Sequence, residues 1–471
     1  MCSPPGESAP ERRSAVKKIE KRTVVCLALT LILLLGVGLF VVRFFWDGGS
    51  WASFAANRHL YNSQGQLSVG RVLDRDGDLL SWVDESGARQ YYANQTVRMA
   101  TLHAVGDPNG AIGTSALVAF ADQLSGYNFL TGADNPFGQG NDLYLTLDAH
   151  LNYVAYQALN GKRGAVGVYN YETGEILCMV STPTFDPANP PQIQEGDERY
   201  EGVYVNRFLS STFTPGSSFK TVTLTAAIEN LPDLFQRTFT CTGSTVVGEE
   251  TITCPSAHGT MDIGGAFASS CNGVFAQLAV ELGADTMERY VEKAGLLGQY
   301  SVDGIQTAKG SYDMAGAAQG QLGWSGVGQS NDLVNPCAMM VWMGGVARGG
   351  RAAVPHLIEK VEGGISLPSL PFGGETGRLI EADTAQILSD MMAQNVIQTY
   401  GSGRFPNMDI CAKSGTAEVG GGRQPNAWFV GFLRNENAPY TLAVVVEEGG
   451  SGASAAGSVA AQVLDALVNG Y

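Results

Sequence analysis

Residues 214–230 read TPGSSFKTVTLTAAIEN and predict a helix. A Pro-Gly pair ahead of a Ser-rich start is typical of a helix N-terminus, and the apolar positions that follow continue the helix. Ser217 and Lys220 are three residues apart, so their side chains emerge on one face of the first turn. A serine hydroxyl becomes nucleophilic when a base takes its proton, and an amine held neutral one turn away provides that base. The helix N-terminus also offers free N–H groups that stabilise an oxyanion.

A second polar motif, Ser270-Cys-Asn272, precedes GVFAQLAVELG, which has the pattern of another helix. It supplies a second hydroxyl for proton transfer and an amide that can hydrogen-bond a peptide backbone. Taken alone, the motif is equally typical of an N-cap serine followed by a polar residue. The S-x-x-K spacing is also common by chance, and Ser14 to Lys17 forms another example. Neither motif identifies a site without the other.

The third motif, Lys413-Ser-Gly-Thr416, lies in CAKSGTAEV, a predicted strand. Lys413, Ser414 and Thr416 present a cation and two hydroxyls, which suit a carboxylate ligand. Gly415 permits another backbone segment to approach closely. On its own the motif would describe an edge strand that ends in small residues.

The periodicity around these motifs predicts an α/β domain with a mostly antiparallel sheet. Five segments have strand patterns, and they lie near the two ends of the domain. The region between them is mainly helical, so we expect a sheet completed by N- and C-terminal segments with an inserted helical subdomain. The predicted strands are GAVGVYNY, EILCMVS, CAKSGTAEV, AWFVGFL and YTLAVVVEE, and the flanking predicted helices are DAHLNYVAYQAL and SVAAQVLDALVNG.

An apolar run near the N-terminus predicts a membrane anchor. Val24 to Val42 contains nineteen residues without a charge, close to the roughly 20 that span a hydrocarbon core. Lys and Arg residues precede the run, so the positive-inside rule places the N-terminus in the cytoplasm. A cleaved signal peptide is the alternative, but the run is longer than a typical signal core and no A-x-A-like site follows it. We expect a single-pass protein of a bacterial cell membrane whose catalytic domain is extracytoplasmic.

The domain organisation follows from this anchor. We expect a cytoplasmic tail at residues 1–22, a transmembrane helix at 23–43, a small accessory domain at 44–140 and the main domain at 141–471. Within the accessory region, Arg71 to Leu80 is typical of a β-hairpin with Asp76-Gly77 at its turn. The net charge of −16 and the absence of a clustered Lys/Arg patch argue against a nucleic-acid partner.

Two of the eight cysteines stand out. Cys241 and Cys254 flank TGSTVVGEETIT, a predicted hairpin, and an extracytoplasmic location permits a disulfide between them. His258 raises the alternative of a zinc site, but one His and two Cys fall short of a closed tetrahedral set. We therefore expect a disulfide or free thiols, with no metal and no cofactor. The cysteines predicted to be buried small apolar residues are Cys178, Cys271, Cys337 and Cys411.

In combination and in this order, the three motifs resemble those of the penicillin-binding proteins and serine β-lactamases. The resemblance covers most of residues 140–471 and is closest to the monofunctional class B penicillin-binding proteins. No segment resembles the glycosyltransferase domain of class A enzymes. The matching segments include LTLDAHLNYVAYQAL, TGEILCMVSTPTFDPANP, NRFLSSTFTPGSSFK, SSCNGVFAQLA, GVGQSNDLVNPCAMM and CAKSGTAEV.

The resemblance implies a peptidoglycan D,D-transpeptidase that cross-links cell-wall stem peptides ending in D-Ala-D-Ala. Ser217 would attack the carbonyl of the penultimate D-Ala, with Lys220 as general base. Ser270 would relay the proton to the departing D-Ala amine, and Asn272 would orient the donor peptide. β-Lactam antibiotics would mimic the donor and trap Ser217.

The resemblance assigns carboxylate recognition to the third motif. Lys413, Ser414, Gly415 and Thr416 would bind the terminal carboxylate, and the backbone N–H groups of the nucleophile and of Thr416 would form the oxyanion hole. Two lysines would then lie close together. Repulsion and partial burial should depress the pKa of Lys220.

Related activities share this chemistry. A serine β-lactamase has all three motifs, and a D,D-carboxypeptidase differs by using water as the acceptor. The anchor and the accessory domain favour a cell-wall synthase. A non-catalytic scaffold or β-lactam sensor is the alternative outside enzymes, although a 22-residue tail is too short for a signalling domain. The resemblance further implies a polytopic lipid II polymerase of the SEDS type as a partner.

Overall fold

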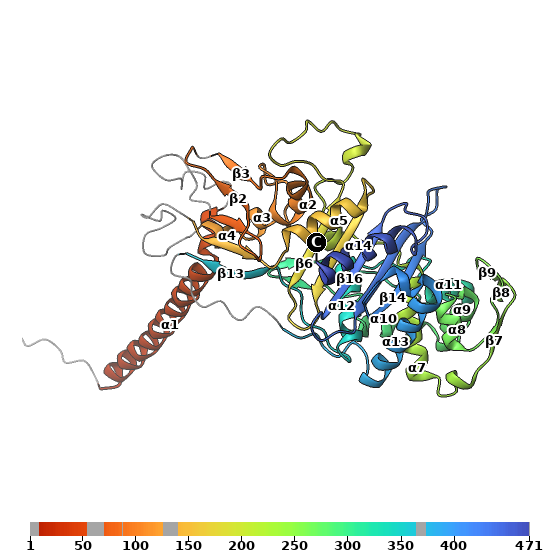
Figure 1. Ribbon diagram of the computed structural model, residues 1–471. Helices are drawn as coiled ribbons and strands as arrows, with labels where there is room; N and C mark the ends of the chain where they lie inside the picture. The colour runs from red at the N-terminus through yellow and green to blue at the C-terminus, as the bar shows by residue number, and fades with distance from the viewer. Residues whose placement is uncertain (1–8, 54–69, 87, 126–139, 364–373, 471) are drawn as a thin grey trace, which may run out of the picture.

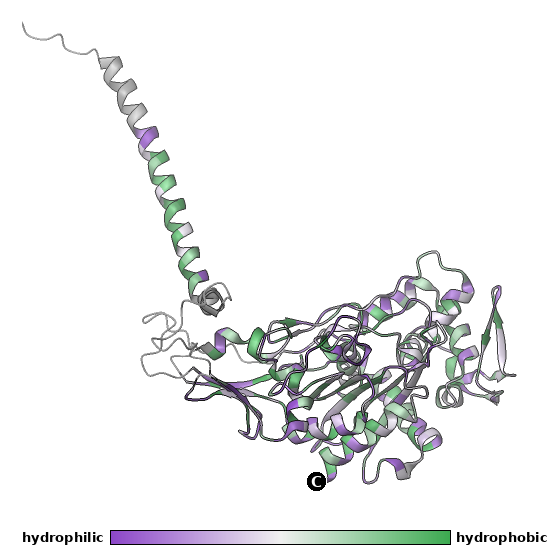
Figure 2. Ribbon diagram, turned by 90° about the horizontal axis from the view of Figure 1, so that it is seen from above, coloured by the Kyte–Doolittle hydropathy of each residue, from purple (hydrophilic) through white to green (hydrophobic). Residues whose placement is uncertain are grey.

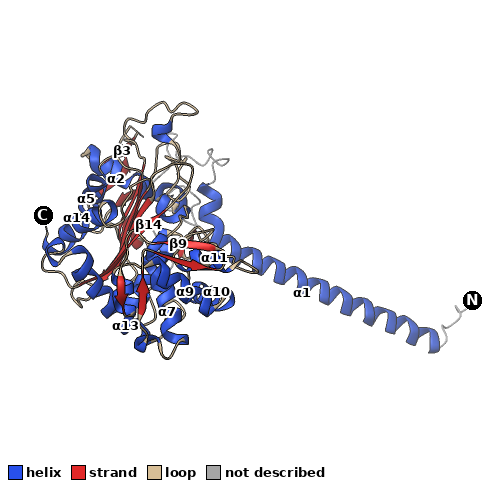
Figure 3. Ribbon diagram, turned by 90° about the vertical axis from the view of Figure 1, so that its right-hand side faces the viewer, coloured by secondary structure: helices blue, strands red, loops and turns tan. Residues whose placement is uncertain are grey.

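The computed structural model describes residues 9–53, 70–86, 88–125, 140–363 and 374–470 (Figure 1). Its first element, helix α1 (Ala9–Ser53), projects from the rest of the chain (Figures 2 and 3). The stretch Glu20–Phe44 of this helix is apolar, exposed and long enough to cross a membrane. The helix begins ahead of the predicted 23–43 span because the preceding Ala, Glu, Lys and Arg residues are good helix formers. Residues 1–8 of the predicted tail lie outside the described residues.

A five-stranded antiparallel sheet forms the centre of the main domain, in the order β14-β15-β16-β5-β6 (Figure 1). Strands from the two ends of the domain lie side by side, since Val166 in β5 pairs with Val444 in β16 and with Val180 in β6. This arrangement confirms the predicted sheet of N- and C-terminal segments. The strands are β5 (Gly164–Asn170), β6 (Ile176–Thr182), β14 (Ile410–Ala417), β15 (Asn426–Leu433) and β16 (Tyr440–Val446).

Helices cover both faces of this sheet, which explains why its strands are almost wholly apolar rather than alternating. On one face, α5 (Ala149–Leu159) and α14 (Ala455–Asn469) bury Leu151 and Val463 against the sheet. On the other face lies α12 (Pro336–Ala347), whose Trp342 is fully buried. The main core therefore sits between the sheet and the helical subdomain.

The helical subdomain is inserted between β6 and β14, as predicted, and carries the hairpin expected at residues 242–253. In that hairpin Val246 of β8 pairs with Thr251 of β9. The helical elements are η2 (Glu198–Tyr200), α6 (Arg207–Ser210), η3 (Gly216–Phe219), α7 (Lys220–Asn230), η4 (Leu234–Gln236), α8 (Ile263–Ala268), α9 (Asn272–Leu282), α10 (Ala284–Lys293), α11 (Gln319–Gly326), α13 (Ala382–Asn395), the π-helical η5 (Val396–Tyr400) and η6 (Ser402–Arg404). The short strands are β7 (Phe239–Cys241), β8 (Ser244–Val247), β9 (Glu250–Thr253), β10 (Gly259–Met261), β11 (Ser301–Val302) and β12 (Ile305–Gln306).

A second five-stranded sheet, in the order β13-β4-β1-β2-β3, lies toward α1 (Figure 1). The hairpin predicted from Arg71 to Leu80 is present as β1 and β2, and Gly77 at its turn has a φ of +88°. Strands from both sides of residue 140 build this sheet, because β1 pairs in parallel with β4. Its elements are β1 (Arg71–Leu73), β2 (Leu79–Val83), β3 (Arg89–Tyr91), β4 (Asp142–Leu145) and β13 (Ile358–Glu362), with α2 (Gln95–Val105), α3 (Ala116–Ala119) and α4 (Ala121–Ser125).

Candidate active site

The predicted helix from Ser217 is present and starts with the 3₁₀ turn η3, which runs directly into α7. The Nζ atom of Lys220 lies 2.9 Å from the Oγ atom of Ser217. Gly216 begins this turn with a φ of +54°, and a Cβ at this position would come within 2.5 Å of the Thr416 carbonyl oxygen. Glycine is therefore required here both by the backbone conformation and by the close approach of strand β14.

Lys220 is fully buried and surrounded by oxygen atoms. Besides Ser217, its Nζ atom lies 2.7 Å from the carbonyl oxygen of Ser270, 3.1 Å from the Ser270 hydroxyl and 2.7 Å from Oδ1 of Asn272. Two of these four oxygens, the Ser270 carbonyl oxygen and Oδ1 of Asn272, can only accept hydrogen bonds, so they take two N–H groups of Lys220. A neutral amine can donate two hydrogen bonds and accept one from the Ser217 hydroxyl. The geometry thus suits an amine that receives the serine proton.

Ser270 lies in the turn between α8 and α9, and the helix predicted after this motif is present as α9, which begins one residue earlier, at Asn272. Ser270 has a φ of +54°, a left-handed conformation that costs a non-glycine residue about 1–2 kcal/mol. This turn directs both the carbonyl and the hydroxyl of Ser270 toward Lys220. The amide of Asn272 is held by a 2.8 Å hydrogen bond from Nδ2 to the Thr253 carbonyl oxygen. The amide therefore bridges Lys220 and the end of β9.

Lys413 to Thr416 lie in β14, at the edge of the central sheet nearest η3. The Nζ atom of Lys413 lies 3.0 Å from the Ser270 hydroxyl, so the first, second and third motifs meet in one place. A Cβ on Gly415 would come within 2.5 Å of the Pro215 carbonyl oxygen. Only glycine lets β14 approach the turn η3 this closely. Thr416 is exposed, and its Oγ1 accepts a 3.1 Å hydrogen bond from the Gly452 backbone.

Both lysines have lowered pKa values. Burial, followed by repulsion from Lys413, holds the pKa of Lys220 well below its usual value. Burial lowers the pKa of Lys413 to about 7. Each side chain also lies near an aromatic face, with Nζ 5.6 Å from the ring centroids of Phe275 and Phe267 respectively. The pKa of Lys220 moves in the direction that the sequence predicts, although burial rather than repulsion is the larger cause.

A cleft of about 850 Å³ opens where residues of the three motifs come together. Its size suits a peptide or a drug-sized ligand. A substrate in this cleft would meet the serine hydroxyl of the first motif and the exposed end of β14 together. Of the predicted site residues, Ser217, Ser270, Asn272, Ser414 and Thr416 line the cleft, together with Trp324, Gln329 and Asn331.

Two residues for which the sequence predicts no role hold β14 in place. Tyr400 ends the π-helical turn η5, and its hydroxyl accepts a 2.6 Å hydrogen bond from the Ser414 backbone N–H and lies 2.9 Å from the Ser414 hydroxyl. Gln329 donates from Nε2 to the Thr416 carbonyl oxygen at 3.2 Å. Gln329 lies within the quoted segment GVGQSNDLVNPCAMM, but no local pattern points to Tyr400. A separate cluster of four side chains, Cys241, Cys254, His258 and Cys271, lies beside the second motif.

Comparison with known proteins places the chain in one family. Residues 164–469 match the family described as the penicillin-binding protein transpeptidase domain. Among curated proteins, the chain is 28% identical over 359 residues to the peptidoglycan D,D-transpeptidase PbpA of Mycolicibacterium smegmatis. This alignment covers 71% of this chain and 72% of that protein. It is 26% identical over 371 residues to the peptidoglycan D,D-transpeptidase MrdA of Acinetobacter baumannii, covering 68% of this chain and 52% of that protein.

Solved structures share the fold. The ceftriaxone acyl-enzyme complex of penicillin-binding protein A from Mycobacterium tuberculosis aligns with a TM-score of 0.74 at 23% identity, over 85% of this chain and 98% of that one. Penicillin-binding protein 2 from Pseudomonas aeruginosa aligns with a TM-score of 0.71 at 24% identity, over 85% and 96% of the two chains. The α/β architecture predicted from the sequence is therefore the architecture of these proteins.

Proposed function

This chain belongs to the penicillin-binding protein transpeptidase family, and we propose that it is a class B peptidoglycan D,D-transpeptidase that works through an acyl-enzyme on Ser217. The observation that carries this proposal is the buried amine of Lys220, 2.9 Å from the Ser217 hydroxyl. A lysine whose pKa is depressed is a better general base near neutral pH than an ordinary lysine, because a larger fraction of it is unprotonated.

In acylation, the Oγ atom of Ser217 attacks the carbonyl carbon of the penultimate D-Ala while Lys220 takes the hydroxyl proton. The resulting oxyanion is stabilised by the backbone N–H groups of Ser217 and Thr416. The C–N bond to the terminal D-Ala then breaks. The departing amine needs a proton, and Ser270 is suited to deliver it because its hydroxyl lies 3.1 Å from the Lys220 amine.

The third motif recognises the carboxylate of the departing D-Ala. Lys413 provides the charge, Ser414 and Thr416 provide hydroxyls at the cleft surface, and Gly415 keeps the strand close to the nucleophile. Asn272, which also lines the cleft, orients the donor peptide. A charged Lys413 beside a bound carboxylate gains a partner, which raises its pKa in the complex.

Deacylation completes the cross-link. The amine of a neighbouring stem peptide attacks the acyl carbon, loses a proton to Lys220, and releases the Ser217 hydroxyl. β-Lactams acylate the same oxygen, since their strained amide replaces the peptide bond of the donor. A D,D-carboxypeptidase or a β-lactamase would use water at this step instead of the amine.

The apolar helix α1 supports a single-pass membrane anchor. We infer that its N-terminus is cytoplasmic and that the catalytic domain is extracytoplasmic, because Lys and Arg gather on the N-terminal side of the apolar stretch. We further infer a polytopic lipid II polymerase of the SEDS type as a partner in the membrane, contacted through α1 and the accessory region 44–140. Co-purification of that partner with the full chain, and its loss when α1 is replaced by an unrelated apolar helix, tests this contact.

Mapping of a penicillin adduct tests the proposed function. The full chain in detergent should form one adduct, on the peptide that contains Ser217, with a lifetime of minutes to hours. A stem peptide plus an amine acceptor should give a cross-linked product. Rapid release of the hydrolysed antibiotic would instead identify a β-lactamase, and release of D-Ala without cross-linking would identify a carboxypeptidase.

A further inference from the structure

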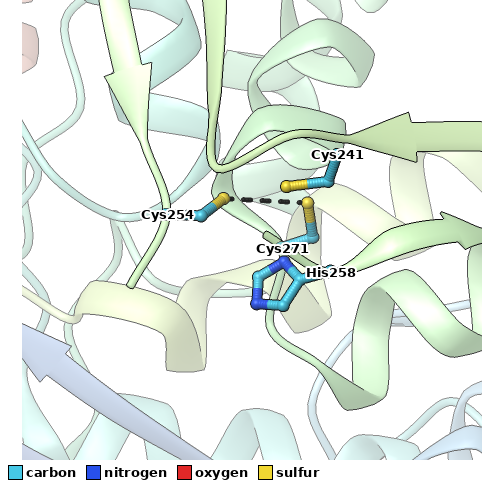
Figure 4. A group of neighbouring side chains, drawn as sticks. All are labelled: Cys241, Cys254, His258 and Cys271. Carbon is cyan, nitrogen blue, oxygen red and sulfur yellow. Dashed lines mark hydrogen bonds between the residues drawn. The ribbon is translucent and has the colours of Figure 1, made fainter. Parts of the chain in front are cut away.

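Four potential metal ligands gather beside the Ser270–Asn272 turn. The sulfur atoms of Cys241, Cys254 and Cys271 and one ring nitrogen of His258 all lie within 4.8 Å of one another. Figure 4 shows the three sulfurs and a nitrogen of the imidazole directed into one common space. All three cysteines are free thiols, and within the described part of the chain no group hydrogen-bonds the buried Nδ1 atom of His258. A buried ring nitrogen without a partner is unusual unless something else occupies its lone pair.

The distance between two of the sulfurs distinguishes the possible roles of this cluster. The Sγ atoms of Cys254 and Cys271 are 3.8 Å apart. A disulfide requires an S–S distance of about 2.0 Å. In a tetrahedral zinc site with Zn–S bonds of about 2.3 Å, two sulfurs are separated by about 3.8 Å. The observed spacing is therefore that of two ligands of one tetrahedral ion.

The fold supplies these ligands from segments that are separate in the sequence. Cys241 ends β7, Cys254 follows β9, and His258 precedes β10. These three residues therefore come from one continuous β-rich segment, the β7–β10 hairpin system. Cys271 comes from the turn before α9, where it is the N-cap residue. Cys271 is the fourth ligand that the sequence pattern did not reveal.

We propose that Cys241, Cys254, His258 and Cys271 bind one structural Zn²⁺ ion. A Cys₃His set in tetrahedral arrangement is a standard closed zinc site, with no position left for substrate. Binding releases the thiol protons and joins the β7–β10 hairpin system to the start of α9. Because Cys271 lies between the two active-site residues of the second motif, the ion fixes the turn that presents them to the cleft. The site is therefore structural and indirectly positions the proposed active site.

Metal analysis of the full-length chain tests this proposal directly. The protein is expressed in zinc-supplemented cells and purified in detergent without chelators. Inductively coupled plasma mass spectrometry should then find about one zinc ion per chain. After removal of the metal, titration with Co²⁺ should produce the absorption bands of a tetrahedral thiolate complex, and Zn²⁺ should displace them. Wild-type protein that contains no stoichiometric zinc and gives an octahedral Co²⁺ spectrum would overturn the proposal, as would a disulfide between any two of the three cysteines in freshly purified chain.

Variants separate the site from general effects on folding. Cys254→Ser and His258→Ala should each lose most of the zinc, while His258→Cys should retain it, because a Cys₄ set is also tetrahedral. Cys178→Ala is the matched control, since Cys178 is a buried free thiol in β6 outside the cluster, and it should keep the full zinc content. Equal zinc in Cys254→Ser and wild type would refute the assignment. Zinc content is measured independently of penicillin acylation, so this test stands whether or not Ser217 is the nucleophile.

Discussion

The side-chain nitrogens of Lys220 and Lys413 lie within 3.1 and 3.0 Å of the same oxygen atom, the hydroxyl of Ser270. Two ammonium groups that share one acceptor in a buried site repel one another strongly. The pair therefore favours a state in which one lysine is neutral, and its titration belongs to both groups together. In our proposal Lys220 is neutral and accepts the serine proton, while Lys413 is charged and binds a carboxylate.

Replacement of the nucleophile should abolish acylation. Ser217→Ala removes the only atom that the mechanism acylates, so a fluorescent penicillin should leave no label on the full chain in gel assays. Ser218→Ala is the control: its hydroxyl donates to the Pro215 carbonyl oxygen at 2.7 Å, and this variant should still be labelled. Thermal melting should show that both variants fold. Undiminished labelling of Ser217→Ala would show that the assignment is wrong.

The acylation rate should rise with pH and then fall. The rising limb reports loss of the proton from Lys220, whose pKa is lowered by burial and by Lys413. The falling limb reports loss of the charge on Lys413, whose pKa is about 7 in the free protein. Lys413→Gln removes the repulsion, so the pKa of Lys220 should rise and the rising limb should move to higher pH.

Stopped-flow measurement of the second-order rate constant with a fluorescent penicillin, across a pH series, tests this profile. Lys360→Gln, at an exposed position in β13, should leave the profile in place. Lys220→Ala should lower the rate at every pH by about 10²–10⁴-fold, the usual contribution of a general base. A rising limb that stays at the same pH in Lys413→Gln would contradict the proposed coupling of the two lysines.

Crowding at Gly415 should separate strand β14 from the nucleophile turn. In Gly415→Ala, the added methyl would come within 2.5 Å of the Pro215 carbonyl oxygen and 3.0 Å of the Ser218 nitrogen. We expect a loss of stability of about 1–3 kcal/mol, as for other overpacked sites, and greatly slowed acylation. Gly377→Ala meets nothing within 4 Å and should change neither the denaturation midpoint nor the acylation rate.

Tyr400→Phe should weaken recognition of the donor while the nucleophile stays competent. The substitution deprives the partly buried Ser414 backbone N–H of its acceptor and frees the Ser414 hydroxyl. A lost partner for a buried donor costs about 1–3 kcal/mol, so kcat/KM for a peptide donor should fall about tenfold or more. Tyr156→Phe, in α5, provides the control, because the Tyr156 hydroxyl contacts only the Met99 sulfur at 3.9 Å among the hydrogen-bonding partners described. Equal kcat/KM values for Tyr400→Phe and Tyr156→Phe would show that Tyr400 does not contribute to recognition of the donor.

Sequence patterns predicted most of the helices and strands, because the spacing of apolar and polar residues along the chain differs between helices and strands. The three-residue spacing of Ser217 and Lys220 places both on one face of the first turn in any helix. The apolar strands around Val166 and Val444 are likewise readable, since their composition suits a sheet buried on both faces. The hairpin between Cys241 and Cys254 follows from two short strand patterns around a turn.

Local patterns therefore identify the short segments that carry the chemistry and the family to which the chain belongs. Three-dimensional packing was needed to show that Ser270 contacts both Lys220 and Lys413 and that both lysines are deeply buried. It was also needed to show that Tyr400 contacts Ser414 and that Cys271 lies beside Cys254. The physical reason is that such contacts join residues far apart in the chain. They depend on how the sheet and the helical subdomain pack, and burial rather than local spacing then sets the pKa values on which the proposed chemistry depends.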